Sequence, residues 1–277
     1  MTGTIQVIRK KSKATKAKDP LAKQKLLWTI GHALTFVCGL AFSITYFYHV
    51  SIFYKYRNWK WLFLRVNKRY AFYQGTNWHY RLLEWTPQIL YRLSLSGVLL
   101  ANGVTMYQNW SHLNPTWFDL LAAENFQSLA VAALWLIGGG KSFYRLLPFM
   151  ILSYLHITSR SHEFTSDDKQ LDRQKSLDNK HMLHVVAYSE IIVILALVLD
   201  TLLLKSGSAG FLLVAYSSLY WLRVNFSAYA QVTILRIVEK LDKKIPAKHR
   251  DSWESVKNFL YAKIKERSDR RVKIERA

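Results

Sequence analysis

Charged residues are absent from several long stretches of the chain, and these stretches set the predicted architecture. No Asp, Glu, Lys or Arg occurs from residue 26 to residue 54, a run of 29 residues. A helix needs about 20 apolar residues to cross a bilayer, so this run is long enough to span one. It is too long for the apolar region of a cleavable signal peptide, and no small-residue cleavage pattern follows it. We therefore predict that it lies in a membrane.

Further apolar stretches follow, separated by residues that break helices. One uncharged run covers residues 93–118, and another covers 125–140 and resumes at 146–159 after a triple glycine. Because glycine and proline interrupt helices, the latter run is expected to form a helical hairpin or a re-entrant pair. Apolar segments 185–204 and 211–222 flank a Gly-Ser-Ala-Gly turn and indicate a second hairpin. The predicted fold is an all-α, polytopic integral membrane protein with four to six apolar helices, some not fully spanning.

Positive charge is concentrated outside the apolar runs. The chain carries 39 Lys and Arg against 18 Asp and Glu, a net charge of +21. Residues 1–25 are strongly basic and indicate a disordered arm whose charge favours a cytosolic N-terminus. Residues 55–92 interleave basic residues with Trp and Tyr, which is typical of an interfacial segment among lipid headgroups. Residues 160–181 balance their charges and indicate a polar loop.

Basic segments flank the first apolar run on both sides, so the sequence leaves its topology open. If both flanks obey the positive-inside rule, residues 26–54 enter and leave on one face as a wedge that bends at Gly31 or Gly39. If the run crosses the bilayer, residues 55–92 lie on the face opposite the N-terminus. Residues 26–230 form the predicted helical membrane domain in either case.

The C-terminal region, residues 231–277, is basic and amphipathic. Pro246 separates two helical patterns, and the second has apolar residues along one side with lysines around them. This pattern is typical of a membrane-surface helix or of a helix that binds a partner's groove, and an ordinary helix packed on its own domain is the plainer alternative. The candidate membrane-binding residues are Trp253, Val256, Phe259, Leu260, Ile264, Lys257 and Lys263.

Two features bear on chemistry inside the membrane domain. A carboxylate in an apolar helix is costly and usually faces a partner or a cavity, which singles out Glu190. We expect Glu190 to be buried, either against Arg223 or at a helix terminus, as a structural ion pair or a neutral acid rather than a proton relay. The histidine pairs His181–His184 and His156–His162 are too few for a di-iron centre, so we expect no metal and no cofactor.

Common catalytic motifs are missing as well. The sequence contains no P-loop, no dinucleotide-binding glycine motif, no Ser-hydrolase elbow and no zinc-protease motif. A single cysteine excludes a disulfide within the chain.

The order of several motifs in the second half carries a family resemblance. The motifs are Leu-Leu-Pro-Phe-Met-Ile-Leu-Ser-Tyr-Leu-His at 146–156, Asp-Asn-Lys-His-Met-Leu-His-Val-Val-Ala-Tyr-Ser-Glu at 178–190, Tyr-Trp-Leu-Arg at 220–223 and Ile-Leu-Arg-Ile-Val-Glu at 234–239. This order resembles the transmembrane-protein-33 family, whose fungal members are pore-membrane proteins of the nuclear envelope. The resemblance covers most of residues 26–244, and Glu190 and Arg223 match positions of the family.

The resemblance implies a non-enzymatic, multi-pass protein of the endoplasmic reticulum and nuclear envelope. It implies that the protein shapes curved membrane and helps to organise, distribute or assemble nuclear pore complexes. The implied partners are the lipid bilayer, nucleoporins, reticulon-like membrane-shaping proteins and an importin-type karyopherin bound through the C-terminal region, with no direct nucleic acid. The alternatives are a reticulum protein that shapes tubules or regulates stress without pore work, and a transporter or lipid-modifying enzyme using Glu190 or the histidines.

Overall fold

A computed structural model provides the structure of the protein. Among the residues that it describes there are helices and no strand, which confirms the predicted all-α class. The described residues are 21–56, 77–111, 113–138, 140–163, 180–203, 207–242, 244–246 and 249–262.

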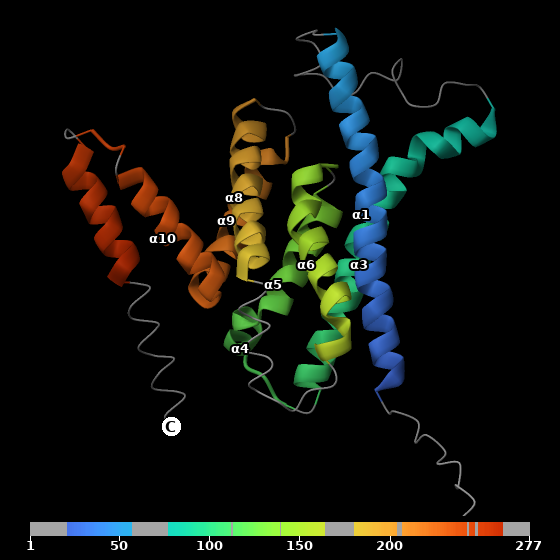
Figure 1. The fold of residues 1–277 in the computed structure, drawn as a ribbon, viewed down its shortest axis with the longest axis horizontal. Helices are drawn as coiled ribbons and strands as arrows, with labels where there is room; N and C mark the ends of the chain where they lie inside the picture. Colours follow the sequence, from blue (N-terminus) through green and yellow to red (C-terminus); the bar gives the residue numbers. More distant parts are fainter. Residues whose placement is uncertain are drawn as a thin grey trace, which may run out of the picture.

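The first apolar run lies in one continuous helix, α1, which extends over Ala22–Tyr56. The wedge interpretation is therefore wrong, because the helix does not bend back at Gly31 or Gly39 (Figure 1). The boundary of the basic arm also needs correction, since the last residues of the segment 1–25 already belong to α1. Residues 1–20 lie outside the described part of the chain.

Helix α3 extends over Trp78–Trp110 and joins two segments that the sequence analysis separated. Residues 78–92, expected to form part of an interfacial helix, are the first half of the same helix that carries the second apolar run. Pro87 lies inside α3, and the helix changes direction so that its first turns leave α1 while the rest lies beside it (Figure 1). Residues 57–76 of the proposed interfacial segment lie outside the described residues.

Three shorter helices follow. Helix α4, Trp117–Ala122, begins with a capping box in which the Thr116 and Asp119 side chains each bond the other's backbone N–H. Helices α5, Glu124–Ile137, and α6, Phe143–Glu163, are joined by a short glycine-containing connection, as expected. They do not pack along each other as a tight hairpin, because α5 lies against α3 and α9 while α6 lies against α1 and α8.

The last described helices form two pairs. Helices α8, Lys180–Leu202, and α9, Ala209–Phe226, pack together around a short turn, as the sequence predicted. Helix α10, Ala228–Asp242, follows α9 directly and contacts both α8 and α9. A further helix, residues 250–262, returns beside α10 (Figure 1), and we call these two helices the C-terminal hairpin.

The six longer helices before this hairpin form a two-row bundle. One row contains α3, α5 and α9, the other contains α1, α6 and α8, and successive helices alternate in direction (Figure 1). The N-terminal end of α1 therefore lies at the same end of the bundle as the starts of α5 and α8. Large buried side chains fill the space between the rows, notably Trp135 of α5 and Leu146 and Phe149 of α6.

Small residues bring α1 and α3 close together. A Cβ added at Gly97 would lie 2.6 Å from the Gly31 carbonyl oxygen and 2.7 Å from the Thr35 nitrogen, so only glycine fits there. The Ser94 hydroxyl donates a hydrogen bond to the Thr35 carbonyl across this contact, at 2.9 Å. Small and hydroxyl residues are typical of helix interfaces in membranes, because they let two backbones approach closely.

Three of the described helices are long and apolar enough to cross a membrane: Ala22–Tyr48 within α1, Trp78–Trp110 and His181–Leu202. Many large apolar side chains on the outside of the bundle are exposed, including Ile44, Leu199 and Phe211. A bilayer supplies the apolar surroundings that such an exterior requires, since a soluble monomer seldom exposes so much apolar surface.

Candidate functional site

A buried ion pair joins two helices of the membrane domain. The Arg223 guanidinium on α9 pairs with the Glu190 carboxylate on α8, and Glu190 is 2% exposed. The same guanidinium donates a second hydrogen bond to the Ser128 hydroxyl on α5, at 2.9 Å. The pair thus ties α5, α8 and α9 together. Of the two partners that the sequence left open for Glu190, the structure selects Arg223.

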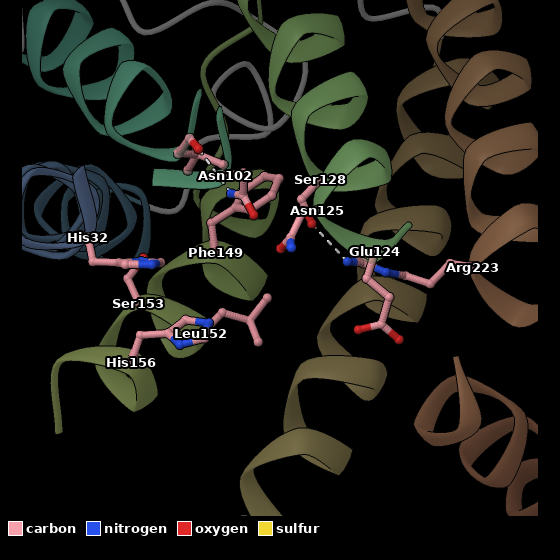
Figure 2. Close-up of a pocket in the computed structure, with 11 residues that line it drawn as sticks. His32, Asn102, Glu124, Asn125, Ser128, Phe149, Leu152, Ser153, His156 and Arg223 are labelled. Atoms are coloured by element: carbon pink, nitrogen blue, oxygen red, sulfur yellow. Dashed lines mark hydrogen bonds between the residues drawn. The ribbon is translucent and has the colours of Figure 1, made fainter. Parts of the chain in front are cut away.

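A polar cavity of about 80 Å³ begins beside this pair. It lies between α1, α3, α5, α6 and α9, and Figure 2 shows side chains from both rows of the bundle pointing into it. Its lining residues are His32, Val98, Asn102, Glu124, Asn125, Ser128, Phe149, Leu152, Ser153, His156 and Arg223. Polar side chains on five helices around one space form a site that the sequence analysis did not assemble.

One wall of the cavity is built from histidine and serine. His32 Nδ1 and Ser153 Oγ share a hydrogen bond of 3.1 Å between α1 and α6, and both residues are buried. The His32 ring lies 4.6 Å, centroid to centroid, from the ring of His156 one turn further along α6. Trp28 covers His32 edge-on from the preceding turn of α1. These contacts fix the imidazoles at the cavity wall.

The ion pair closes the inner end of the cavity. Beyond it lies a much smaller space of about 10 Å³, lined by Glu190, Tyr216, Trp135 and Arg145 among others. Arg145 donates to the Gly140 carbonyl at 2.8 Å and its guanidinium stacks 4.7 Å from the Trp135 ring centroid. Arg145 therefore fastens the α5–α6 connection at the end of the bundle opposite the N-terminus.

The C-terminal hairpin is held together by one carboxylate. Asp242 Oδ1, at the end of α10, accepts hydrogen bonds from Lys257 Nζ and from Trp253 Nε1, each at 2.8 Å. Donation from Lys257 first, and then from Trp253, lowers the pKa of the Asp242 carboxyl below its ordinary value. Trp253 and Lys257, both candidates for membrane binding, thus face α10 in this structure.

Other residues of the same helix are uncovered. Val256 is 48% exposed and Phe259 is 54% exposed, while Leu260 is half-buried. Lys263 and Ile264 lie outside the described residues. Val256 and Phe259 are the two candidate residues that the structure leaves available to a membrane surface.

A relative covers the whole chain. The protein named "Uncharacterized membrane protein YGR026W" from Saccharomyces cerevisiae is 57% identical over 277 residues, which is 100% of this chain and 99% of the relative. The chain belongs to the family of this yeast membrane protein. No family model matches the chain, and no solved structure matches it.

Membership in this family agrees with the helical bundle. The relative is named a membrane protein, and the present chain has three helices able to cross a bilayer together with shorter apolar helices beside them. The protein is therefore a membrane protein with several apolar helices.

The histidines singled out from the sequence do not gather in one place. His184 is buried and shares a hydrogen bond of 3.1 Å with the Thr233 hydroxyl of α10, whereas His181 is exposed. His156 lines the cavity with His32, and the side chain of His162 lies outside the described residues. Within the described ranges no three His, Cys, Asp or Glu residues are placed to hold a metal ion.

Sequence reasoning missed most of the cavity. His32, Asn102, Ser128 and Ser153 are uncharged and lie within apolar runs, so a search for charged residues passed over them. Their polarity could have indicated that they lie between helices, because side chains that form hydrogen bonds inside a membrane domain tend to face other helices.

Proposed function

We propose that this protein shapes or stabilises curved membrane in the endoplasmic reticulum and nuclear envelope, and thereby helps to organise, distribute or assemble nuclear pore complexes. In this proposal it works without enzymatic activity and as a member of the transmembrane-protein-33 family. The resemblance of the second half of the chain supports the location and the pore role. Family membership with a yeast membrane protein supports the membrane setting.

The C-terminal hairpin is the observation that carries the proposal. It lies at the side of the bundle (Figure 1), and Val256 and Phe259 on its 250–262 helix are exposed. An amphipathic helix that buries such residues among lipid headgroups adds area to one leaflet and so favours curvature. Basic side chains around it favour anionic lipid heads.

Reconstitution of the full-length protein into vesicles tests the mechanism. We expect the native chain to draw vesicles into tubules visible by electron microscopy, and the double variant Val256→Asp/Phe259→Asp to lose this activity. The matched control Ser252→Asp/Asn258→Asp adds the same charge at exposed polar positions of the same helix and should retain tubulation. Equal loss in both double variants would show that charge, rather than apolar insertion, is responsible.

Imaging separates pore work from a general reticulum role. A tagged chain that concentrates at pores, and whose Val256→Asp/Phe259→Asp variant leaves pores clustered, supports the pore function. The proposed partners, which are nucleoporins, reticulon-like proteins and an importin-type karyopherin, would be recovered by crosslinking the tagged chain in cells. A uniform signal along reticulum tubules favours the alternative of tubule shaping or stress regulation without pore work.

The polar cavity favours a transporter as the second candidate function. A buried ion pair at the end of a polar space is a frequent feature of substrate pathways in membranes. The transporter hypothesis expects Glu190→Gln to abolish a transport activity while the protein still folds. The membrane-shaping hypothesis expects the same variant, wherever it folds, to tubulate vesicles normally.

A further inference from the structure

The polar cavity has features of a ligand site that membrane shaping does not use. We propose that it binds a small primary ammonium ion, which enters from the face that carries the N-terminus. The inference rests on three properties of the cavity, namely its opening, its charge and its free hydrogen-bonding groups. It is independent of the C-terminal hairpin, so either proposal can fail without the other.

The opening of the cavity lies at Glu124. This residue is the first of α5, is exposed, and lines the cavity, so the cavity reaches the surface at the N-terminal end of the bundle. In Figure 2 its carboxylate lies below the Arg223 guanidinium, away from the two histidines. The inner end is closed by the Glu190–Arg223 pair and by Phe149. Glu124 therefore marks a route into the cavity from that face.

The charge around the cavity is negative. Arg223 brings one positive charge, but Glu190 is paired with it, and Glu124 adds a carboxylate that forms no ion pair within the described residues. The start of α5 contributes about half a positive charge, which is less than the full charge of Glu124. The balance of these charges favours a cation.

Several acceptor oxygens line the cavity. The Asn102 amide nitrogen donates to the Val98 carbonyl at 2.9 Å, which leaves its oxygen as the free end. Asn125 offers a second amide oxygen, and Glu124 offers its carboxylate at the opening. An ammonium group has three N–H donors and no acceptor, so it matches these groups better than an anion does.

The size of the cavity limits the ligand. Liquid water occupies about 30 Å³ per molecule, so 80 Å³ holds an ion of two or three heavy atoms rather than a bulky one. Ethylammonium is a suitable probe of this size. Tetramethylammonium carries the same charge without N–H groups and has five heavy atoms, so it is the control for effects of charge that do not require entry into the cavity.

Cysteine labelling tests the proposal on the full-length chain. Cys38 is the single native cysteine and is buried, so Cys38→Ala provides a cysteine-free background. Ser153→Cys, and separately Ser128→Cys, place a thiol in the cavity with little change in volume. Ser111→Cys at the exposed end of α3 reports the reactivity of an open thiol at the same end of the bundle.

The measured quantity is the ratio of two rates of thiol labelling. The first is the rate with 2-aminoethyl methanethiosulfonate, which carries a primary ammonium group, and the second is the rate with the anionic 2-sulfonatoethyl methanethiosulfonate. Sealed vesicles that display an N-terminal epitope outward, with free cysteine trapped inside, restrict the reaction to that face. We expect the ratio at the cavity thiols to exceed that at Ser111→Cys by about tenfold or more, because a negative charge near the thiol speeds the cationic reagent and slows the anionic one.

Two further measurements decide the assignment. Glu124→Gln should lower the cavity ratio to that of Ser111→Cys, whereas Glu239→Gln, an exposed carboxylate on α10, should leave it unchanged. Ethylammonium should slow the labelling and tetramethylammonium should not. The proposal is overturned if neither cavity thiol reacts, if the anionic reagent is preferred, if Glu124→Gln has no effect, or if both probes slow labelling equally.

Discussion

Glu190 and Arg223 stabilise each other's charged form, because both lie inside the bundle, where an unpaired charge is costly. Removing one partner of a buried pair leaves the other charge unpaired, which costs about 3–5 kcal/mol in soluble proteins. We therefore expect Glu190→Gln and Arg223→Gln each to lower the free energy of unfolding by roughly this amount. The double replacement by leucine should cost far less than the two single costs together.

Ser128 provides the matched comparison, since it accepts a single hydrogen bond from the Arg223 guanidinium. Ser128→Ala should lower the free energy of unfolding by about 1.5–3 kcal/mol, less than either charge removal. Unfolding titrations of the purified variants in detergent measure all four effects. Additive losses in the leucine double variant would mean that the two residues do not act as a pair.

Asp242 makes the docking of the 250–262 helix dependent on pH. Its pKa is lowered by the bonds from Lys257 and Trp253, so the docked form is favoured while the carboxylate is charged. The stabilisation is present above the ordinary pKa of an Asp carboxyl and is lost as the pH falls through the lowered pKa. We expect the Trp253 indole N–H resonance to move in that acidic range, and Asp242→Asn to produce the undocked position at neutral pH. A resonance that ignored both changes would contradict the docking.

Individual residues were predictable from the sequence only where they carried charge. Glu190 was singled out because a carboxylate in an apolar run is conspicuous, and its pairing with Arg223 followed as one of two options. His32 and Ser153 are polar but uncharged, so their meeting across 121 residues of chain was invisible without the fold. Trp253 was assigned to the lipid surface because it lies on the apolar side of its helical pattern. The pattern does not reveal that the Asp242 carboxylate accepts a hydrogen bond from the Trp253 indole N–H.

The contact between helices α1 and α3 depends on Gly97 and does not depend on Gly103. Gly97→Ala should lower the free energy of unfolding by about 1–3 kcal/mol, because its methyl group would press on the backbone of α1. Gly103 lies six residues further along α3 and has nothing within 4 Å of an added Cβ. Gly103→Ala should therefore be neutral or stabilise by up to about 1 kcal/mol through helix propensity. Thermal unfolding of the two variants side by side checks the difference, which equal effects would refute.

The positions of the helices were easier to predict from the sequence than the contacts that the helices make. The apolar runs predicted α1, α8 and α9, because the absence of charge is a local property of the sequence. The glycines of α1 were considered as bends in one of the two topologies that the sequence left open. In the structure they allow α3 and α6 to approach α1, which depends on residues far away in the chain. The start of α3 at Trp78 was missed for a similar reason, since Pro87 bends the helix without ending it.

For the molecule as a whole, the alternating helices define two faces. The last turn of α1 and the first turn of α3 lie at the end of the bundle opposite the start of α1, and so do the end of α8 and the start of α9 (Figure 1). The end of α6 and the start of α8 lie at the end where α1 begins. In sealed microsomes, we expect an epitope inserted at Asp168 to share the protease sensitivity of an N-terminal epitope. An epitope at Gly207 should show the opposite sensitivity. Identical behaviour at Asp168 and Gly207 would contradict the alternating arrangement.

Helix α5 has a consequence for the lipid around it. Its 14 residues rise about 21 Å, whereas the hydrocarbon layer of a typical bilayer is about 30 Å thick and that of the endoplasmic reticulum about 27 Å. Ile137 at its last turn is 85% exposed and faces outward. The acyl chains beside α5 must therefore shorten to match it, at an elastic cost that grows with bilayer thickness. The short helix α5 therefore favours a thin membrane, whereas the longer helices α1 and α3 of the same bundle can span a thick one.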